Sequence, residues 1–249
     1  MALSKNKLKY IRALQQKKYR QKYNKFLAEG DKIVREILAA GHPVEWLLAT
    51  PGWLSRTPQN WPTDQLIEVS ERELEQASGL STPQGVLAVV EQLSPPPTPL
   101  WRPGQWGLFL SDIQDPGNAG TMLRIADWFG WHPVIFSQQT ADLYHPKVIQ
   151  ASMGAFLRVP VFRQDLPGFM ADYPDCPRYA ADAGGESVFA QRHLNPGLLV
   201  IGNEGRGLSP DLTDLIQHKL SIPPGRQGGA ESLNAAVACG ILVAALTHR

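Results

Sequence analysis

Short apolar runs alternate with helix-like stretches along the chain after residue 104. Near-continuous apolar strands that alternate with helices are typical of a mostly parallel sheet covered on both faces. In such a sheet ligands bind outside the carboxyl ends of the strands, so we expect chemistry in the loops that follow them. The predicted strands cover 107–111, 133–137, 178–182, 198–202 and 219–223, and the predicted helices cover 119–129, 145–157, 210–217 and 231–246.

The chain before residue 94 has a different pattern, with a basic helix first, a second helix near 31–40 and apolar runs at 46–49, 66–69 and 86–90. This pattern predicts a small α/β module. The next segment, SPPPTPLWRPG, is too rich in proline for a helix or a central strand, because proline removes a backbone donor and fixes φ. It predicts a stiff extended connection. We therefore expect a first domain over 1–93, a linker over 94–104 and a second domain over 105–249.

Composition narrows the class of protein. The 249 residues are 43% hydrophobic and 19% charged, as in an ordinary globular protein. Cys176 and Cys239 are too few for a disulfide framework or a cysteine-based zinc site, which favours a reducing, cytoplasmic setting. The six histidines show no metal-binding spacing, so we expect no metal. The basic N-terminus lacks the apolar core of a signal peptide, and the run 233–246 is too short to span a bilayer, so we expect no membrane association.

The charge of the chain is segregated along its length. Nine Lys and Arg residues precede the first acidic residue, Glu29, and the rest of the chain has 15 basic against 23 acidic residues. Such a basic segment attracts a polyanion, and a phosphate backbone is the commonest one, although a solvated helix face or a mobile arm has the same composition. Tyr10, Tyr19 and Tyr23 lie among these charges and could stack on bases. Tyr19, Tyr23 and Phe26 also share helical spacing, which favours burial of the last two.

The loop after the first predicted strand of the second domain leads into a helix. Asn118 is predicted to cap the helix over 119–129. Arg124 lies within the apolar stretch of that helix, where a guanidinium needs a partner or a ligand. The alternative is an arginine whose stem packs on the helix while its charge reaches water.

Two further loops carry glycines and polar side chains. The loop 202–209 has the spacing GxxGxG, which is neither a dinucleotide-binding fingerprint nor a P-loop. Its Glu204 could orient a donor or polarise a hydroxyl, or it could be a turn carboxylate in water. The segment 222–238 enters the last helix through Ser232 and Asn234, which are typical capping residues. The small residues of that helix favour close packing, within the domain or across a subunit interface.

Together these loops resemble a known family. Asn118-x-Gly120-x-x-x-Arg124, Gly202-Asn-Glu204-Gly-x-Gly, and Ile222-Pro with Ser232-Leu-Asn234 are similar, in order and spacing, to the three motifs of the SpoU (TrmH-like) RNA 2′-O-ribose methyltransferases. The stretches 18–30 and 81–88 resemble the small RNA-binding domain of that family, which is similar to ribosomal protein L30e. The resemblance implies an α/β protein with two parts, an L30e-like domain and a SPOUT-class domain with a parallel sheet and a trefoil knot, which acts as a homodimer.

The same resemblance implies an activity and its residues. The family transfers a methyl group from S-adenosylmethionine to a ribose 2′-hydroxyl, and its second and third motifs bind the cofactor, here through Gly202, Ile222 and Leu233. Arg124 is then expected to orient the hydroxyl or a phosphate and to stabilise developing negative charge. The proton acceptor is solvent or Glu204. The expected catalytic set is Asn118, Arg124, Glu204, Ser232 and Asn234, and the expected RNA-binding set is Lys17, Lys18, Arg20 and Lys22.

The resemblance leaves several substrates possible, and the chain differs from the family at two places. Members with the L30e-like module are more often ribosomal RNA enzymes, so we expect rRNA, with tRNA as the alternative. A catalytically silent RNA-binding protein of the same fold is a second alternative, and an ordinary nucleotide-binding enzyme is a third. The family commonly has serine where this chain has Ala236, and the loop 224–230 is longer and richer in glycine than usual. Both departures bear on the geometry around the cofactor.

Overall fold

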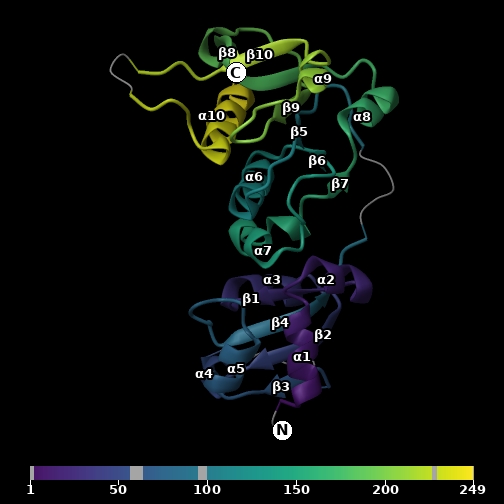
Figure 1. Cartoon of the computed structure of the whole chain (residues 1–249), viewed down its shortest axis with the longest axis vertical. Helices are drawn as coiled ribbons and strands as arrows, with labels where there is room; N and C mark the ends of the chain where they lie inside the picture. Colours follow the sequence, from purple (N-terminus) through teal and green to yellow (C-terminus); the bar gives the residue numbers. More distant parts are fainter. Residues whose placement is uncertain (1–2, 57–63, 95–99, 226–228, 249) are drawn as a thin grey trace. The chain divides into compact units, whose positions relative to one another are not determined.

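The computed structural model describes residues 3–56, 64–94, 100–225 and 229–248 (Figure 1). The chain forms two compact units, the first made of 1–94 and 144–157, and the second of 95–143 and 158–249. The chain therefore passes from one unit to the other three times. One crossing falls at the start of the predicted linker, of which 95–99 lie outside the described residues, and the sequence gives no sign of the other two.

The first unit is built on a four-stranded sheet in the order β1-β4-β2-β3. The β1–β4 and β4–β2 pairs are antiparallel, and the β2–β3 pair is parallel. The strands are β1 (Lys25–Glu29), β2 (Val44–Ala49), β3 (Leu66–Glu68) and β4 (Val86–Glu91). The helices of this unit are α1 (Lys5–Ala13), α2 (Lys17–Tyr23), α3 (Asp31–Ala39), α4 (Pro51–Arg56), α5 (Glu71–Ala77) and α7 (Pro146–Ser152), followed by the short 3-10 helix η1 (Ala155–Leu157).

Helices pack on both faces of this sheet because successive residues of β1 point to opposite sides. Leu27 faces a core that it shares with Ile11 of α1 and Leu74 of α5. Its neighbour Phe26 contacts the ring of Tyr144, at 4.9 Å between centroids, and that of Phe156, at 5.7 Å. The segment 144–157 thus completes the core of the first unit.

The second unit has a six-stranded sheet in the order β10-β8-β9-β5-β6-β7, and every neighbouring pair in it is parallel. This arrangement confirms the predicted parallel sheet. Its strands are β5 (Gly107–Leu110), β6 (Val134–Phe136), β7 (Val161–Arg163), β8 (Arg178–Ser187), β9 (Leu198–Ile201) and β10 (His218–Ser221). Its helices are α6 (Pro116–Phe129), α8 (Leu166–Asp172), α9 (Pro210–Thr213) and α10 (Ala235–Thr247), with the 3-10 helix η2 (Val188–Ala190).

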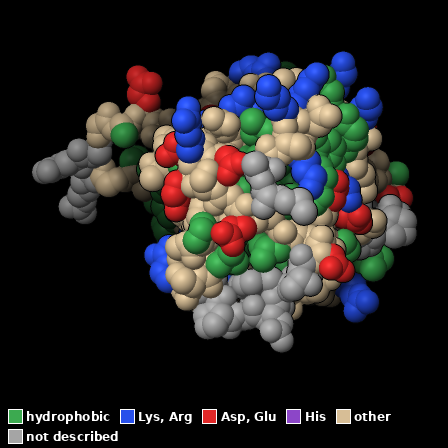
Figure 2. All heavy atoms as spheres, turned by 90° about the horizontal axis from the view of Figure 1, so that it is seen from below, with side chains coloured by type: hydrophobic (Ala, Val, Ile, Leu, Met, Phe, Trp, Pro, Cys, Tyr) green, Lys and Arg blue, Asp and Glu red, His purple; other side chains and the backbone are tan. Residues whose placement is uncertain are grey.

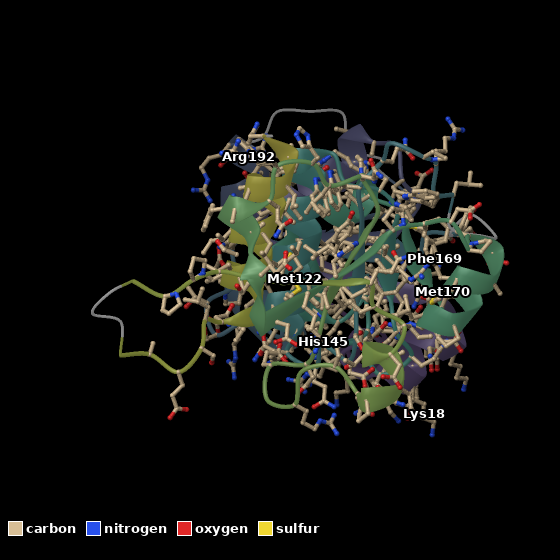
Figure 3. All side chains as sticks on the ribbon, turned by 90° about the horizontal axis from the view of Figure 1, so that it is seen from above. Lys18, Met122, His145, Phe169, Met170 and Arg192 are labelled. Carbon is tan, nitrogen blue, oxygen red and sulfur yellow. The ribbon has the colours of Figure 1, made fainter. Side chains whose placement is uncertain are left out.

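Helices cover the two faces of this parallel sheet (Figure 1). On one side α8 buries Leu166 and Phe169 against Phe109 and Val200 of the central strands. On the other side α10 packs along α6, where Gly240 allows its backbone to approach Ile125. Viewed from above, Met122 of α6 lies in the interior of this unit and Phe169 lies on α8, whereas Arg192 lies at the edge (Figure 3).

Several predicted elements differ from the structure. The predicted helix over 210–217 ends at Thr213, and the last helix begins at Ala235 rather than at residue 231, because Asn234 is its N-cap. Strand β8 continues to Ser187, well beyond the predicted residue 182. Phe26 is buried, as expected, but it lies in β1 because α2 ends at Tyr23 with Asn24 in the left-handed region. Within the described ranges, no helix combines the length and apolarity needed to span a membrane.

Candidate functional site

Three loops of the second unit leave the sheet at the same edge. They follow β5, β9 and β10 at Ser111, Gly202 and Ile222. Because all strands of this sheet are parallel, their carboxyl ends lie together, and β5 and β9 are direct neighbours. This edge is where the sequence predicts the chemistry.

The loop after β5 is held by a network of hydroxyl and carboxylate groups. Asp112 has φ 56°, a left-handed conformation, and its backbone N–H donates to Ser137 Oγ at 2.9 Å. The Ser137 hydroxyl lies 2.6 Å from Asp112 Oδ1, and Thr140 Oγ1 donates to the Leu110 carbonyl at 2.7 Å. A residue outside its preferred backbone region persists only where its surroundings determine it, and here two neighbouring segments do so.

The loop after β9 is joined to the loop after β5 by Asn203. Its Nδ2 donates to the Asp112 carbonyl at 2.9 Å, and its Oδ1 accepts from the backbone N–H groups of Gly205 and Arg206. Gly202 has no room for a side chain, because a Cβ atom there would lie 2.6 Å from the carbonyl carbon of Gly207. Asn203 therefore sets the shape of the loop that carries Glu204.

One hydrogen-bonded chain of side chains joins the three predicted motifs. Asn118 Nδ2 donates to Glu204 Oε1 at 2.8 Å, and Asn118 Oδ1 accepts from Asn234 Nδ2 at 3.0 Å. Asn234 Oδ1 in turn accepts from the backbone N–H groups of Ala236 and Val237 and so caps α10. Asn118 therefore holds Glu204 on one side and the start of α10 on the other.

Asn118 has this position because it is not the helix cap that the sequence predicts. The cap of α6 is Asp115, whose Oδ1 accepts from the backbone N–H of Asn118 at 2.7 Å, with Pro116 as the first helical residue. Proline suits this position because the N–H that it lacks would have no helical partner. The Asn118 amide is consequently available to the other two loops.

Arg124 lies on a different part of α6. It is six residues after Asn118, about 9 Å further along the helix axis, and its side chain is exposed. Among the described residues its guanidinium has no hydrogen-bond or ion-pair partner. Arg124 shares an exposed face of α6 with Thr121 and Trp128, three residues before and four after it, and Trp128 is 83% exposed.

The predicted cofactor-binding residues follow the strands β9 and β10 or precede α10. Ile222 is half-buried, and Leu233 is 48% exposed, although large apolar side chains are usually covered. Ser232 is also exposed. Among the described residues, no side-chain hydrogen bond joins any of these to the Asn118 network. Residues 226–228 of the glycine-rich loop 224–230 lie outside the described residues.

The predicted RNA-binding residues divide into two groups. Lys17, Lys18 and Lys22 are exposed, and Lys and Arg side chains gather along one edge of the face shown in Figure 2. Arg20 is only 1% exposed, and its Nη1 donates to the carbonyls of Leu14 and Gln15 at 2.9 and 2.8 Å. These carbonyls end α1, so Arg20 joins α1 to α2 and is not available to a phosphate.

Some residues of the site were missed by the sequence analysis. Asn203 enters the sequence-based prediction only as part of the second motif, and Asp112 and Asp115 are not part of that prediction. The sequence feature that marks these residues is their position directly after a buried strand and before a helix. Within the described ranges, no cluster of three metal-ligating side chains is placed to hold a metal ion.

The comparisons with known proteins match both units. Residues 106–244 match the SpoU rRNA Methylase family, and residues 5–88 match the MRM3-like substrate binding domain. A relative from Bacillus subtilis, named 23S rRNA (guanosine(2553)-2′-O)-methyltransferase RlmP, is 31% identical over 95% of this chain and 94% of its own. The solved SpoU methyltransferase AviRb from Streptomyces viridochromogenes, in complex with AdoMet, is 28% identical, covers 98% of this chain and 97% of its own, and has a TM-score of 0.83. A solved TrmH-family protein from Porphyromonas gingivalis is 36% identical with the same coverage and TM-score.

Proposed function

This chain belongs to the SpoU rRNA methylase family, and from that premise we propose that it methylates a ribose 2′-hydroxyl in ribosomal RNA. It is an RNA 2′-O-methyltransferase that uses S-adenosylmethionine. The observation that carries the proposal is the hydrogen-bonded chain Asn234–Asn118–Glu204, because it joins the three family motifs at one edge of the parallel sheet.

S-adenosylmethionine supplies a methyl group that its sulfonium has already activated. The chain must therefore position the ribose and help its 2′-hydroxyl to lose a proton. Asn118 holds the Glu204 carboxylate at a fixed place, where it can accept a hydrogen bond from the hydroxyl. The proton acceptor is then Glu204 or a water molecule beside it. Ser232, which is exposed two residues before Asn234, would contact the ribose or its phosphate.

Arg124 acts as a charge rather than as a base, because a guanidinium does not lose its proton in proteins. We assign to it the orientation of the hydroxyl or of the neighbouring phosphate and the stabilisation of the developing oxyanion. Its exposure and its lack of a partner among the described residues support this role, because the group is free to meet an anion.

Gly202, Ile222 and Leu233 fit the binding of S-adenosylmethionine. They carry no charge, and Leu233 leaves about half of its surface uncovered beside loops that follow parallel strands. Such a combination of apolar surface and loop backbone suits the adenosine and the methionine carbons of the cofactor. Ala236 offers no hydroxyl where the family commonly has one, and its backbone N–H is already bound by Asn234.

The finer organisation of the protein is also part of the proposal. The first unit would bind the RNA and the second would hold the cofactor, with the linker at 94–104 between them. A trefoil knot in the second unit is supported by its likeness to solved members of the family. A homodimer is supported by the uncovered Trp128 of α6 and Val237 of α10, which is 52% exposed, because α6 and α10 pack on each other. The proposed compartment is the cytoplasm.

Ribosomal RNA is favoured over tRNA by the named relatives. A relative that matches over 95% of this chain is named for 23S rRNA, and the match includes the first unit. A neighbour solved for methylation of tRNA covers only 59% of this chain.

Transfer of labelled methyl from S-adenosylmethionine to RNA tests the proposal. Purified 23S rRNA, 16S rRNA, ribosomal subunits and tRNA are incubated with the whole chain and then hydrolysed with alkali. A 2′-O-methylated ribose blocks cleavage, so we expect the label in an alkali-stable dinucleotide from an rRNA fraction, and less of it with Asn118→Ala. Label confined to tRNA would reject the substrate, and label in mononucleotides would reject the reaction. No label in any fraction and no binding of S-adenosylmethionine would favour a silent RNA-binding protein.

A further inference from the structure

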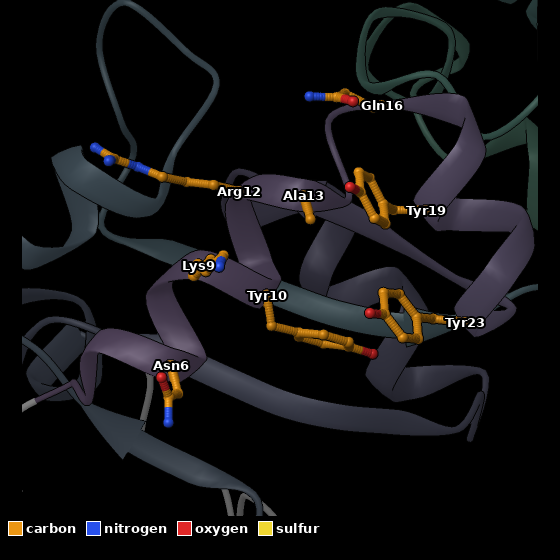
Figure 4. A pocket seen from close by; sticks show the side chains of 8 residues that line it. All are labelled: Asn6, Lys9, Tyr10, Arg12, Ala13, Gln16, Tyr19 and Tyr23. Carbon is orange, nitrogen blue, oxygen red and sulfur yellow. The ribbon is translucent and has the colours of Figure 1, made fainter.

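The first unit has a pocket between α1 and α2 that lies outside the three methyltransferase motifs. It encloses about 440 Å³, within the range of pockets that hold small ligands. Figure 4 shows its side chains, of which the rings of Tyr10, Tyr19 and Tyr23 point towards one another from the two helices. None of them is acidic. The pocket is lined by Asn6, Lys9, Tyr10, Arg12, Ala13, Gln16, Tyr19 and Tyr23.

Three tyrosine rings give the pocket an aromatic wall. Tyr19 and Tyr23 are stacked, with an interplanar angle of 13° and 6.2 Å between centroids. The ring of Tyr10 lies 4.9 Å from that of Tyr23 and 5.3 Å from that of Trp46 behind it. The Tyr10 hydroxyl donates to Glu45 Oε2 at 3.1 Å, which further fixes this ring. The wall is therefore formed before any ligand binds, and little side-chain entropy is lost on binding.

Cations border the aromatic wall. Lys18 Nζ lies 5.7 Å from the centroid of Tyr19, and Lys22 Nζ lies 5.3 Å from that of Tyr23. In the pocket itself Arg12 is held by a bond from its Nε to the Gln76 carbonyl at 2.6 Å. Lys9 is exposed and has no carboxylate partner within the described part of the chain. Glu45, which accepts from the Tyr10 hydroxyl, also lies 3.7 Å from Lys25, so a cation balances its charge.

We propose that this pocket binds one unpaired nucleotide of the substrate RNA. The base would stack on Tyr19, the phosphate would meet Lys9 and Arg12, and the amides of Asn6 and Gln16 would contact the edge of the base. A paired base has both faces covered by its neighbours, so the aromatic wall selects a nucleotide outside a helix. An acidic peptide would pair with the cations but would not stack on the tyrosine rings. The proposal rests on the proposed function for the kind of polymer that the protein meets.

Binding of a short RNA to the whole chain, without S-adenosylmethionine, tests the pocket. The probe is a fluorescein-labelled single strand of eight nucleotides, and the comparison is the same strand within a perfect duplex. Stacking of one base contributes on the order of 1–3 kcal/mol, so we expect Tyr19→Leu to weaken binding of the single strand about 5- to 150-fold. Tyr19→Phe keeps the ring and should bind like the unmodified chain. Duplex binding should be the same for all three proteins.

A matched pair of lysines tests the phosphate contact. Lys9 lines the pocket, whereas Lys5 is an exposed lysine on the same helix outside it. Each phosphate contact with a single strand contributes about 0.7 to the slope of log affinity against log salt. We expect Lys9→Gln to lower that slope by about this amount and Lys5→Gln to leave it unchanged. Equal slopes for the two variants would overturn the assignment of Lys9.

Photocrosslinking of RNA to the unmodified chain tests the pocket without any substitution, and so does not depend on the folding of a variant. A probe with one 4-thiouridine, irradiated in the complex and digested, should be found on a peptide from α1 or α2 that contains Tyr10, Tyr19 or Tyr23. Crosslinks confined to other peptides, or Tyr19→Leu binding like the unmodified chain, would overturn the proposal. Neither measurement requires methyl transfer, so failure of the proposed activity and failure of the pocket give different results.

Discussion

The two sites of this chain are built from different kinds of side chain. At the strand ends of the second unit, Asn118, Glu204 and Asn234 are joined by hydrogen bonds of 2.8 and 3.0 Å. In the first unit, the pocket between α1 and α2 combines tyrosine rings with lysines whose charges reach water. The site in the second unit is a network of directional hydrogen bonds, whereas the pocket in the first unit is a surface of cations and aromatic rings.

The difference follows from what each site has to do. Methyl transfer requires the reacting atoms to be aligned closely, and hydrogen-bonded amides on a sheet edge supply fixed positions. Capture of an RNA requires attraction over a longer range and tolerance of sequence, which exposed cations and aromatic faces supply. We therefore expect substitutions in the second unit to affect the rate of transfer, and those in the first unit to affect binding or stability.

The largest expected effect is that of Arg124→Ala. Loss of a group that stabilises developing charge lowers the rate by on the order of 10²–10³-fold. We expect this loss in single-turnover methyl transfer, with calorimetric binding of S-adenosylmethionine unchanged. Thr121→Ala, on the same exposed face of α6, is the matched control and should react normally. Equal loss of transfer and of cofactor binding would contradict the role given to Arg124.

Arg20→Leu is expected to act on stability rather than on chemistry. The substitution removes both bonds to the Leu14 and Gln15 carbonyls and leaves these acceptors unpaired beside a buried side chain. We expect a decrease of about 2–3 kcal/mol in the free energy of unfolding, measured in urea with a probe in the first unit. Lys18→Leu, two residues earlier and exposed, should change it little. A stable Arg20→Leu protein with weakened RNA binding would return Arg20 to the RNA-binding set.

We expect the exposed lysines of α2 to determine how strongly the affinity for RNA depends on salt concentration. Lys17, Lys18 and Lys22 are free to contact phosphates, and each contact contributes about 0.7–0.9 to the slope of log affinity against log salt. Replacing all three by glutamine should lower the slope for rRNA by about 2 without lowering the rate of transfer at saturating RNA. An unchanged slope would move the RNA-binding surface away from α2.

The smallest expected effect concerns pH. Glu73 closes the capping box of α5, and hydrogen bonds to its carboxylate, first from the Ser70 backbone N–H, lower the pKa of Glu73 below its ordinary value. A carboxyl whose pKa is lowered in the folded state stabilises the protein at neutral pH and loses this contribution as pH falls through the lowered value. Glu73→Gln should therefore flatten the acid limb of the first unit's stability curve. The measurement is the urea midpoint between pH 7 and pH 3, and identical curves for both proteins would contradict the assignment.

Much of the second unit could be predicted from the sequence because parallel strands have a simple pattern. Apolar runs such as 198–202 locate the strands, and parallel strands bring their following loops to one edge, so the position of the site follows. The hydrogen bonds within it do not follow from the pattern. Asn118 was predicted to cap α6, since the sequence alone does not show that Asp115, three residues earlier, takes this position.

The first unit was harder to predict because the many basic residues at its start do not show which side chains are buried. Strand β1 follows directly on a basic helix, and its Phe26 continues the helical spacing of Tyr19 and Tyr23. Arg20 looks like its neighbours in composition, but only the turn between α1 and α2 gives it two carbonyls as partners. The two crossings at residues 143 and 157 depend on contacts between Phe26 and a segment more than a hundred residues away.

The segment 144–157 determines how the first unit could be exchanged between related proteins. Tyr144 and Phe156 cover Phe26 with their rings, so the first unit is not a cassette that can be cut out at the linker. A graft limited to residues 1–93 would carry an open core, and the remainder would expose two aromatic rings. Exchange of RNA-binding modules between relatives would have to move residues 144–157 together with the N-terminal part, as two inserts.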